Sequence, residues 1–340
     1  MAGSELTNIK SPRVKAARRL TKRAFRDRDR SFLAEGPQAV REALALDGVV
    51  TELFTTAEAE IRHADIVAAA RDAGVPVHRA SGEVMAELAQ TVTPQGLLAV
   101  CGFVHVPLER AVTAGARLVT VLAHVRDPGN AGTVLRSADA AGADAVVFTD
   151  ASVDPYNGKC VRASAGSLFH LPVVTGVPVA QAVRELKEAG LRVLAADGAG
   201  TRTLDDVDLS GPTAWIFGNE AWGLPEEILR LADDVVRVPI YGRAESLNLA
   251  TAAAVCLYAS ARSQRAASRL PPATRRRKPP GPVPPCPADR RRGCRRTRET
   301  RYCRRCSVEE AGSCTTDTPT SGALTPRVSS AWTTCPTASW

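Results

Sequence analysis

Short apolar runs alternate with helix-like segments through most of this 340-residue chain, and no other feature limits its fold as strongly. The runs at 118–123, 145–149 and 213–217 have the length of buried strands, and helical periodicity fills much of the sequence between them. Strands that alternate with helices form a mostly parallel sheet covered on both faces. The sequence therefore predicts the α/β class.

The first 105 residues show the same alternation on a smaller scale, which predicts a small α/β domain. Its helices are expected at 8–30, 37–46, 58–73 and 83–90. A polar stretch with Pro107 and Gly115 then predicts a linker at 106–117, and the larger domain follows at 118–267, with a further strand expected at 169–174.

The net charge of +8 is unevenly distributed. Residues 268–340 carry 15 Lys and Arg against 5 Asp and Glu, whereas the remaining 267 residues carry 29 against 31. A second basic segment, Lys10 to Arg30, holds 10 basic groups. Such an arm is typical of phosphate contacts, although a solvated helix face has the same composition.

Residues 268–340 are rich in Pro, Arg, Ser and Thr and lack aliphatic periodicity, so we predict a disordered tail. Cys303 and Cys306 could indicate zinc, but their spacing from Cys286 and Cys294 fits no common site, so no metal is expected. The abrupt change of composition also raises the hypothesis of out-of-frame translation of a GC-rich gene.

Three cysteines lie among small or apolar neighbours in the body of the chain and are predicted to be buried in a reducing compartment: Cys101, Cys160 and Cys256. The sequence contains no run of 18 apolar residues, so no membrane span is predicted. The N-terminus also lacks the apolar stretch of a secretory signal. We therefore expect a cytoplasmic protein.

A strand, a polar turn and an unusually apolar helix follow one another at 235–259. The strand is expected at 235–240, and Ser246, Leu247 and Asn248 stand at the entrance of the helix. Apolar residues leave little of that helix polar, so we expect it to be buried. Backbone amides at such a turn can meet the polar edge of a small molecule.

Two earlier stretches also end strands with glycine and polar side chains. The first places Asn130 at a helix entrance after a Pro-Gly turn, with Arg136 further along that helix. The second is a strand that ends at Gly218, with Glu220 just beyond it. Open parallel sheets bind ligands at this carboxyl edge of their strands. Taken alone, the first stretch also fits a capping asparagine and a surface arginine.

In this order and spacing, the three motifs resemble those of the SpoU (TrmH) family of RNA ribose 2′-O-methyltransferases, of the knotted SPOUT class. The resemblance covers about residues 10–265 and rests on N-x-G-x-x-x-R at Asn130, Gly132 and Arg136, G-x-E at Gly218 and Glu220, and P…S-L-N at Pro239 and Ser246 to Asn248.

The family resemblance implies S-adenosylmethionine as the methyl donor, a trefoil knot in the larger domain and a homodimer formed through it. It also implies an L30e-like N-terminal domain that binds RNA, with ribosomal RNA the first expectation and transfer RNA the second. His124, Val125 and Arg126 depart from the aliphatic or acidic residues that the family often has there, which could tune the substrate.

By motif position, the resemblance assigns backbone contacts with the donor to Gly218, Val238 and Leu247, with Ile240 nearby. It assigns the ribose side to Asn130, Arg136, Glu220, Ser246 and Asn248. A guanidinium stays protonated, so we interpret Arg136 as holding a phosphate and polarising the hydroxyl rather than as a base. Glu220 is interpreted as ordering the loops, and it also stays open as a proton acceptor.

Three other functions are alternatives to this one. Asp197 to Gly200 hints at a Rossmann turn, but a third glycine and a convincing helix are missing, so this turn is expected at the rim of the donor site. A non-catalytic RNA-binding module of the same fold stays open. A hydrolase is rejected because the histidines are scattered and no G-x-S-x-G motif occurs.

Overall fold

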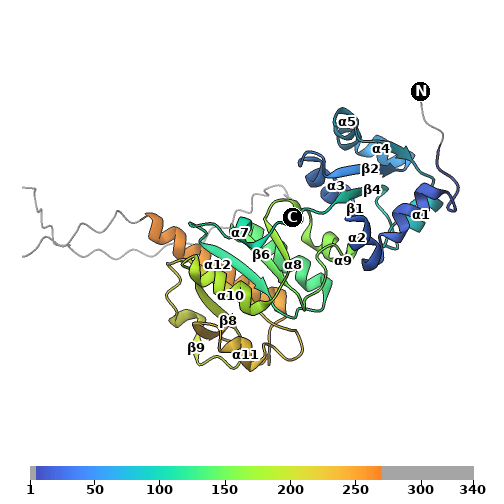
Figure 1. Cartoon of the computed structure of the whole chain (residues 1–340). Coiled ribbons are helices and arrows are strands. Elements are labelled where there is room, and N and C mark those ends of the chain that lie inside the picture. Colours follow the sequence, from blue (N-terminus) through green and yellow to red (C-terminus); the bar gives the residue numbers. More distant parts are fainter. Residues whose placement is uncertain (1–4, 270–340) are drawn as a thin grey trace, which may run out of the picture. The chain divides into compact units, whose positions relative to one another are not determined.

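The computed structural model describes residues 5–269, and Figure 1 labels many of their helices and strands. Apart from its first two residues, the predicted tail at 268–340 lies outside the described residues, and so do the zinc and frameshift hypotheses attached to it. Within the described range, no helix has both the length and the hydropathy needed to cross a membrane.

The N-terminal half of the described chain builds a four-stranded sheet in the order β1-β4-β2-β3. These strands are β1 (Ser31–Glu35), β2 (Val50–Thr55), β3 (Val77–Arg79) and β4 (Leu97–Gly102). Strand β4 is antiparallel to both of its neighbours, and β2 is parallel to β3. Buried side chains of α1 (Pro12–Arg19) and α6 (Gly82–Leu88) pack on one face, and those of α3 (Pro37–Leu44) and α5 (Ala64–Asp72) pack on the other.

Two helix predictions in this half are wrong, because the segments 8–30 and 58–73 each form two helices instead of one. The basic segment 8–30 divides into α1 and α2 (Arg23–Asp29). The buried Arg26 donates to the backbone oxygens of Leu20 and Thr21, at 3.0 and 2.9 Å, and so satisfies carbonyls at the end of α1.

The segment 58–73 likewise divides into α4 (Ala57–Arg62) and α5. The backbone of His63 leaves the helical region between them, with φ −122° and ψ 44°. The sequence has no glycine or proline at this point, so local propensity does not mark the break.

The predicted linker at 106–117 is partly folded onto the larger domain. It contains α7 (Leu108–Ala111), whose Leu108 and Ala111 side chains are buried in the core of that domain. Val106 also donates its backbone N–H to Val173.

The rest of the described chain forms a seven-stranded sheet in the order β7-β6-β5-β10-β8-β11-β9. Its strands are β5 (Leu118–Leu122), β6 (Ala145–Thr149), β7 (Val173–Val177), β8 (Arg192–Ala196), β9 (Arg202–Thr203), β10 (Thr213–Phe217) and β11 (Asp234–Arg237). Every strand pair in this sheet is parallel. The predicted α/β class with a parallel sheet is therefore confirmed.

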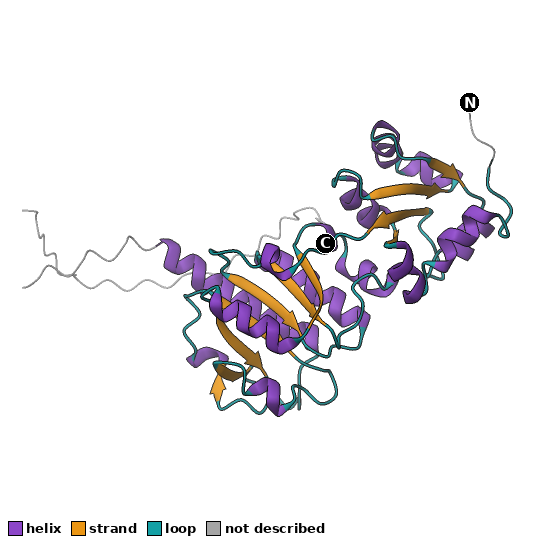
Figure 2. Cartoon of the chain, viewed as in Figure 1, coloured by secondary structure: helices purple, strands orange, loops and turns teal. Residues whose placement is uncertain are grey.

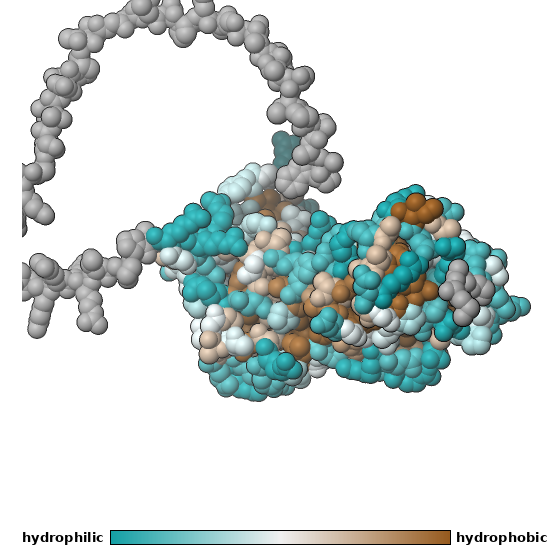
Figure 3. Space-filling model, turned by 90° about the horizontal axis from the view of Figure 1, so that it is seen from above, coloured by the Kyte–Doolittle hydropathy of each residue, from teal (hydrophilic) through white to brown (hydrophobic). Residues whose placement is uncertain are grey.

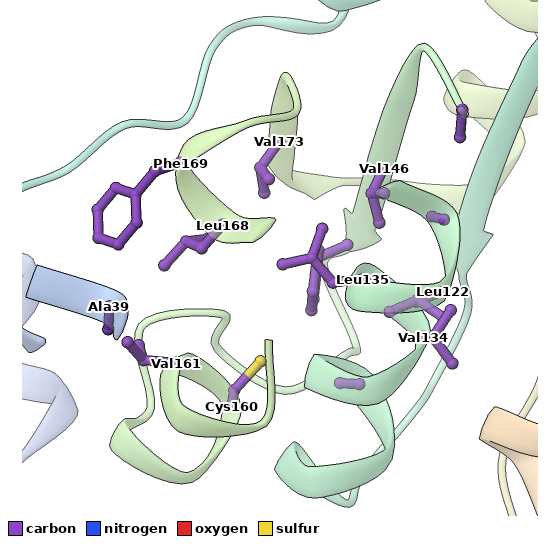
Figure 4. Close-up of a cluster of buried hydrophobic side chains, with 14 of the residues drawn as sticks. Ala39, Leu122, Val134, Leu135, Val146, Cys160, Val161, Leu168, Phe169 and Val173 are labelled. Carbon is purple, nitrogen blue, oxygen red and sulfur yellow. The ribbon is translucent and has the colours of Figure 1, made fainter. Parts of the chain in front are cut away.

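Helices cover both faces of this sheet, as Figure 2 shows. One face is covered by α8 (Pro128–Ala141), α9 (Gly158–Ser164) and α12 (Leu249–Arg269), and the other by α7, α10 (Val179–Glu188) and α11 (Glu226–Leu229). Figure 4 shows Cys160 of α9, Leu135 of α8 and Val146 of β6 in one cluster of buried hydrophobic side chains. Cys101, Cys160 and Cys256 are buried as predicted, and burial raises the pKa of each thiol.

Two predictions in the larger domain need correction. The strand expected at 169–174 is displaced to β7, because Phe169 belongs to a short 3-10 turn and stacks near Phe32 of the smaller sheet. Helix α12 is also not buried on every side. Ala253, Cys256 and Leu257 take the inward-facing positions, which leaves Val255 and Tyr258 40% and 46% exposed.

Both sheets belong to one unit of the chain, Met1–Arg276, and their side chains meet in a partly charged joint. Arg26 pairs with Asp154, and the two side chains are only 4% and 10% exposed. Arg162 of α9 donates to Glu35 at 3.0 Å, and Figure 4 shows Val161 next to Ala39 of α3. The face of the molecule seen in Figure 3 is mostly hydrophilic, with brown hydrophobic areas between the hydrophilic ones.

Candidate active site

The loops after β5, β8, β10 and β11 meet at one edge of the larger sheet. Because these strands are parallel, their carboxyl ends lie on the same side, although the loops are far apart in sequence. The three predicted motifs lie in or directly after these loops, so the sheet topology brings them together.

A cavity of about 240 Å³ lies among the loops after β8, β10 and β11. It is lined by all four residues that the family resemblance assigned to the methyl donor, namely Gly218, Val238, Ile240 and Leu247. Glu220 and Ser246 of the predicted ribose side line it too, as do Asp197 and Gly198, where the sequence placed a rim turn. Sequence reasoning missed further lining residues, among them Ala196, Gly223, Val236, Leu249 and Ala252.

A tight turn after β10 forms one wall of the cavity. Asn219 and Gly223 each donate a backbone N–H to the other's carbonyl, at 2.8 and 3.0 Å. A Cβ on Gly218 would lie 2.5 Å from the carbonyl oxygen of Gly223, so only glycine fits without a shift of the turn. Gly223 has φ +71°, and a Cβ there would meet the Asp197 carboxylate. The glycine and proline of Trp-Gly-Leu-Pro at 222–225 are typical of a turn, and this pattern could have indicated Gly223 from the sequence.

Glu220 joins the turn after β10 to the loop after β5. Its carboxylate accepts from the side-chain amide of Asn130 at 3.1 Å and from the backbone N–H groups of Asp127 and Arg126 at 3.3 and 3.4 Å. A second bond between the same loops runs from the Asn219 amide to the His124 carbonyl, at 3.0 Å. One exposed carboxylate therefore holds two donors from the loop after β5 and one from Asn130 of the first motif.

Asn130 extends this network to the third motif. Its side-chain oxygen accepts from the Asn248 amide at 3.1 Å, and Asn248 caps α12 by accepting from the N–H of Ala250 at 2.9 Å. Asp127 caps α8 in the same way and also accepts from Lys159 at 2.7 Å. The Lys159 contact lowers the pKa of Asp127, so this cap stays ionised.

The structure brings the predicted residues together unevenly. Asn130, Glu220 and Asn248 form one hydrogen-bonded chain, and Ser246 lies in the cavity wall. Arg136 stands apart on α8, where its exposed side chain makes no hydrogen bond or ion pair with other described residues.

The alternative Rossmann reading of the segment 197–200 does not fit the structure. Gly200 leads into the two-residue strand β9 and a 3-10 turn, so no helix begins there to receive a phosphate. The Asp197 carboxylate instead accepts from the backbone N–H groups of Ala199 and Leu224, and it steadies the cavity wall.

His124 has no arrangement typical of a hydrolase base. Its backbone adopts φ +59°, and its ring packs edge-on against Trp222 at 5.6 Å between centroids. Within residues 5–269, no cluster of three or more His, Cys, Asp or Glu side chains has the arrangement of a metal site.

A parallel sheet that brings these three motifs to one edge, joined by hydrogen bonds beside a cavity, is the arrangement expected of the RNA methyltransferases that the motifs resemble. Residues 117–258 match the SpoU rRNA Methylase family, and residues 11–99 match the MRM3-like substrate binding domain.

Individual relatives agree with this class. The chain is 37% identical over 255 residues to the 23S rRNA (guanosine(2553)-2′-O)-methyltransferase RlmP of Bacillus subtilis, covering 75% of this chain and 98% of the relative. It resembles the crystal structure of an AdoMet-bound rRNA methyltransferase from Sinorhizobium meliloti, with a TM-score of 0.68, 33% identity and coverage of 76% and 97%. It also resembles the crystal structure of AviRb from Streptomyces viridochromogenes in complex with AdoMet, with a TM-score of 0.67 and 29% identity. This match covers 75% of this chain and 100% of AviRb. This chain belongs to the SpoU rRNA methylase family.

Proposed function

We propose that this protein transfers a methyl group from S-adenosylmethionine to a ribose 2′-hydroxyl of ribosomal RNA. The observation that carries the proposal is that the strand order brings the three motifs to one edge of the sheet. There Glu220, Asn130 and Asn248 form a hydrogen-bonded chain beside the cavity that Gly218 and Leu247 line. Transfer RNA is the second candidate substrate. A non-catalytic RNA-binding module is the alternative.

The chemistry of the cavity fits the proposed donor. Val238, Leu247 and Phe217 offer apolar surface for a flat adenine ring, and the carboxyl groups of Asp197 and Glu220 suit a cation. S-adenosylmethionine, when bound, supplies a methyl group on a positively charged sulfur. The two structural relatives described above were solved with this compound.

Different residues around the cavity would align the motif loops and the target ribose. Glu220 orders the first and second motifs, because both of its oxygens already accept hydrogen bonds. Arg136 stays protonated and has no described ion-pair partner, so its charge is available to a phosphate next to the target ribose. Such alignment of the hydroxyl lowers the barrier to transfer.

Helices α1 and α2 support a role for the smaller domain in binding RNA. Arg18 and Arg19 pair with Glu87 and Asp29, whereas Lys15 and Lys22 are exposed and make no ion pair with described residues. Backbone phosphates are the natural partners of such charges. The match of residues 11–99 to a substrate binding domain points the same way.

A homodimer formed through the larger domain completes the proposal, together with the knot expected there. The exposed Val255 and Tyr258 are one turn apart on α12, and Thr251 and Arg262 continue this face. An apolar pair on an exposed helix face is typical of an interface. We expect Val255→Arg to shift the sedimenting species from dimer to monomer, and an unchanged dimer would exclude this face. We place the protein in the cytoplasm, where rRNA is modified.

The test is transfer of labelled methyl from S-adenosylmethionine to total RNA by the wild type, Arg136→Ala and Arg184→Ala. Arg184 is a matched control, because it is exposed on α10, at the opposite face of the sheet from α8. Label in a 2′-O-methyl nucleoside from the wild type and Arg184→Ala, but not from Arg136→Ala, is the expected result. Absence of label on every RNA, including RNA from a strain that lacks the gene, would favour the non-catalytic module.

A further inference from the structure

Trp222 is an exposed tryptophan in the turn that carries Glu220. Its side chain is 53% exposed, whereas Trp215 in β10 is fully buried and donates its ring N–H to Ser260. Single exposed apolar residues are common on proteins. The position of Trp222, two residues from the carboxylate that orders the site, is what sets it apart.

The turn after β10 directs Trp222 away from the donor cavity. Gly218, Glu220, Ala221 and Gly223 all line that cavity, but Trp222 does not. The indole lies instead beside the loop after β5, where its ring meets the His124 imidazole edge-on. The turn therefore separates a donor side from an outer side.

The backbone around Trp222 is already ordered. The reciprocal bonds between Asn219 and Gly223 close the turn, and the Asn219 side chain accepts from the N–H of Ala221 at 2.9 Å. The same asparagine is tied to the His124 carbonyl. An aromatic ring held in this way loses little conformational freedom when a second ring stacks on it.

Arg126 adds a positive charge to the same loop whose His124 ring contacts Trp222. It follows His124 by two residues, its side chain is exposed, and it makes no ion pair with other described residues. The Arg126 backbone N–H meanwhile donates to Glu220. An aromatic face and an unpaired guanidinium beside the reaction site are the two groups that recognise an unstacked nucleotide, one at its base and one at its phosphate.

We infer that Trp222 is the stacking platform for the base of the nucleotide that is methylated, and that Arg126 contacts a phosphate beside it. This inference rests on the function proposed above. The ligand is an unpaired nucleotide of the RNA substrate, turned out of its helix so that its 2′-hydroxyl faces the donor cavity.

The test compares the wild type, Trp222→Ala and Trp222→Phe as full-length proteins. Their substrate is the RNA fragment in which the wild type places the label. A second substrate is the same fragment with an abasic ribose at the target position, which keeps the 2′-hydroxyl. Sedimentation of each variant checks the oligomeric state.

We expect Trp222→Ala to lower kcat/KM on the intact fragment about fivefold to 150-fold, the range for loss of one base–aromatic stack. Trp222→Phe should restore most of the activity, and wild type and Trp222→Ala should be equal on the abasic fragment. A merely structural role would lower activity on both fragments alike.

Three results would overturn the inference while the proposed function stands. These are full activity of Trp222→Ala on the intact fragment, an equal loss on both fragments, and a change of oligomeric state in Trp222→Ala. If the wild type labels no RNA, the proposed function itself fails, and the inference fails with it.

Discussion

The joint between the two sheets and the edge of the larger sheet use polar groups in opposite ways. At the joint, the Arg26 and Asp154 side chains are nearly excluded from water. At the edge, the Glu220 carboxylate is exposed and accepts three longer hydrogen bonds. Removal of a buried partner leaves an uncompensated charge, whereas exposed groups can exchange their partners for water or substrate. The joint therefore contributes to the stability of the fold, whereas the polar groups at the edge can exchange their hydrogen-bond partners.

The largest effect is expected for Arg26→Met at the joint. This change leaves the Asp154 carboxylate buried without its cation and the carbonyls of Leu20 and Thr21 without their donor. The free energy of unfolding should fall by about 3–5 kcal/mol in urea denaturation. The control is Arg23→Met, whose exposed pair with Asp27 contributes less than about 1 kcal/mol. Equal losses in the two variants would remove the contrast between joint and surface.

Glu220→Ala should affect activity and leave stability nearly unchanged. Loss of the carboxylate releases Asn130 and the loop after β5, and misplacement of aligned groups costs about one hundredfold in rate. Initial rates of methyl transfer measure this effect, and Glu220→Gln should retain part of the activity because its oxygen still accepts. A fall in the urea midpoint as large as that of Arg26→Met would contradict an exchangeable network.

Gly132→Ala tests how closely helices α8 and α9 approach each other at Gly132. A Cβ at this position would lie 2.3 Å from the Cys160 carbonyl of α9 and 3.0 Å from the Ser164 amide. Separation of α8 and α9 should cost about 1–3 kcal/mol in thermal or urea unfolding. Gly82→Ala is the control, because a Cβ there meets nothing within 4 Å. Equal stability of the two variants would show that the helices can move apart freely.

The smallest effect concerns His170, which lies between Asp139 of α8 and Glu42 of α3. The hydrogen bond to Asp139 raises the pKa of the His170 imidazole in the folded protein. Burial lowers this pKa and the contact with Glu42 raises it, and the net shift is upward. The protonated ring therefore stabilises the fold fully below its unfolded pKa of about 6.5. This contribution is lost as the pH rises through the folded value.

Urea unfolding of the wild type and His170→Gln across pH 5.5 to 8.5 measures this pH dependence. The difference between the two proteins should shrink as the pH rises. A constant difference would show that the titration of His170 does not contribute. Because the side chain is 40% exposed, solvent keeps the effect small.

The elements with strong local patterns were predicted well. The apolar run at 213–217 is strand β10, and a helix does run through Asn130, although α8 begins earlier, at Pro128, and includes the predicted Pro-Gly turn. The donor-side residues Gly218, Val238, Ile240 and Leu247 also reach one cavity, because each follows a strand whose carboxyl end lies at the same edge. The misplaced boundaries lie where no local signal exists, as at His63, or where a distant side chain acts, as Asp154 does on Arg26.

The sequence by itself determined the α/β class and the polar groups that the site can use, because apolar spacing, glycine turns and asparagine caps act on the backbone within a few residues. Only the tertiary structure decided which partners these groups have. The bonds from Glu220 to Asn130, and from Asn130 to Asn248, join segments that the parallel strand order brings together. The exposed sides of α12 and Trp222 were decided in the same way, because exposure depends on what packs against a residue and not on its own pattern.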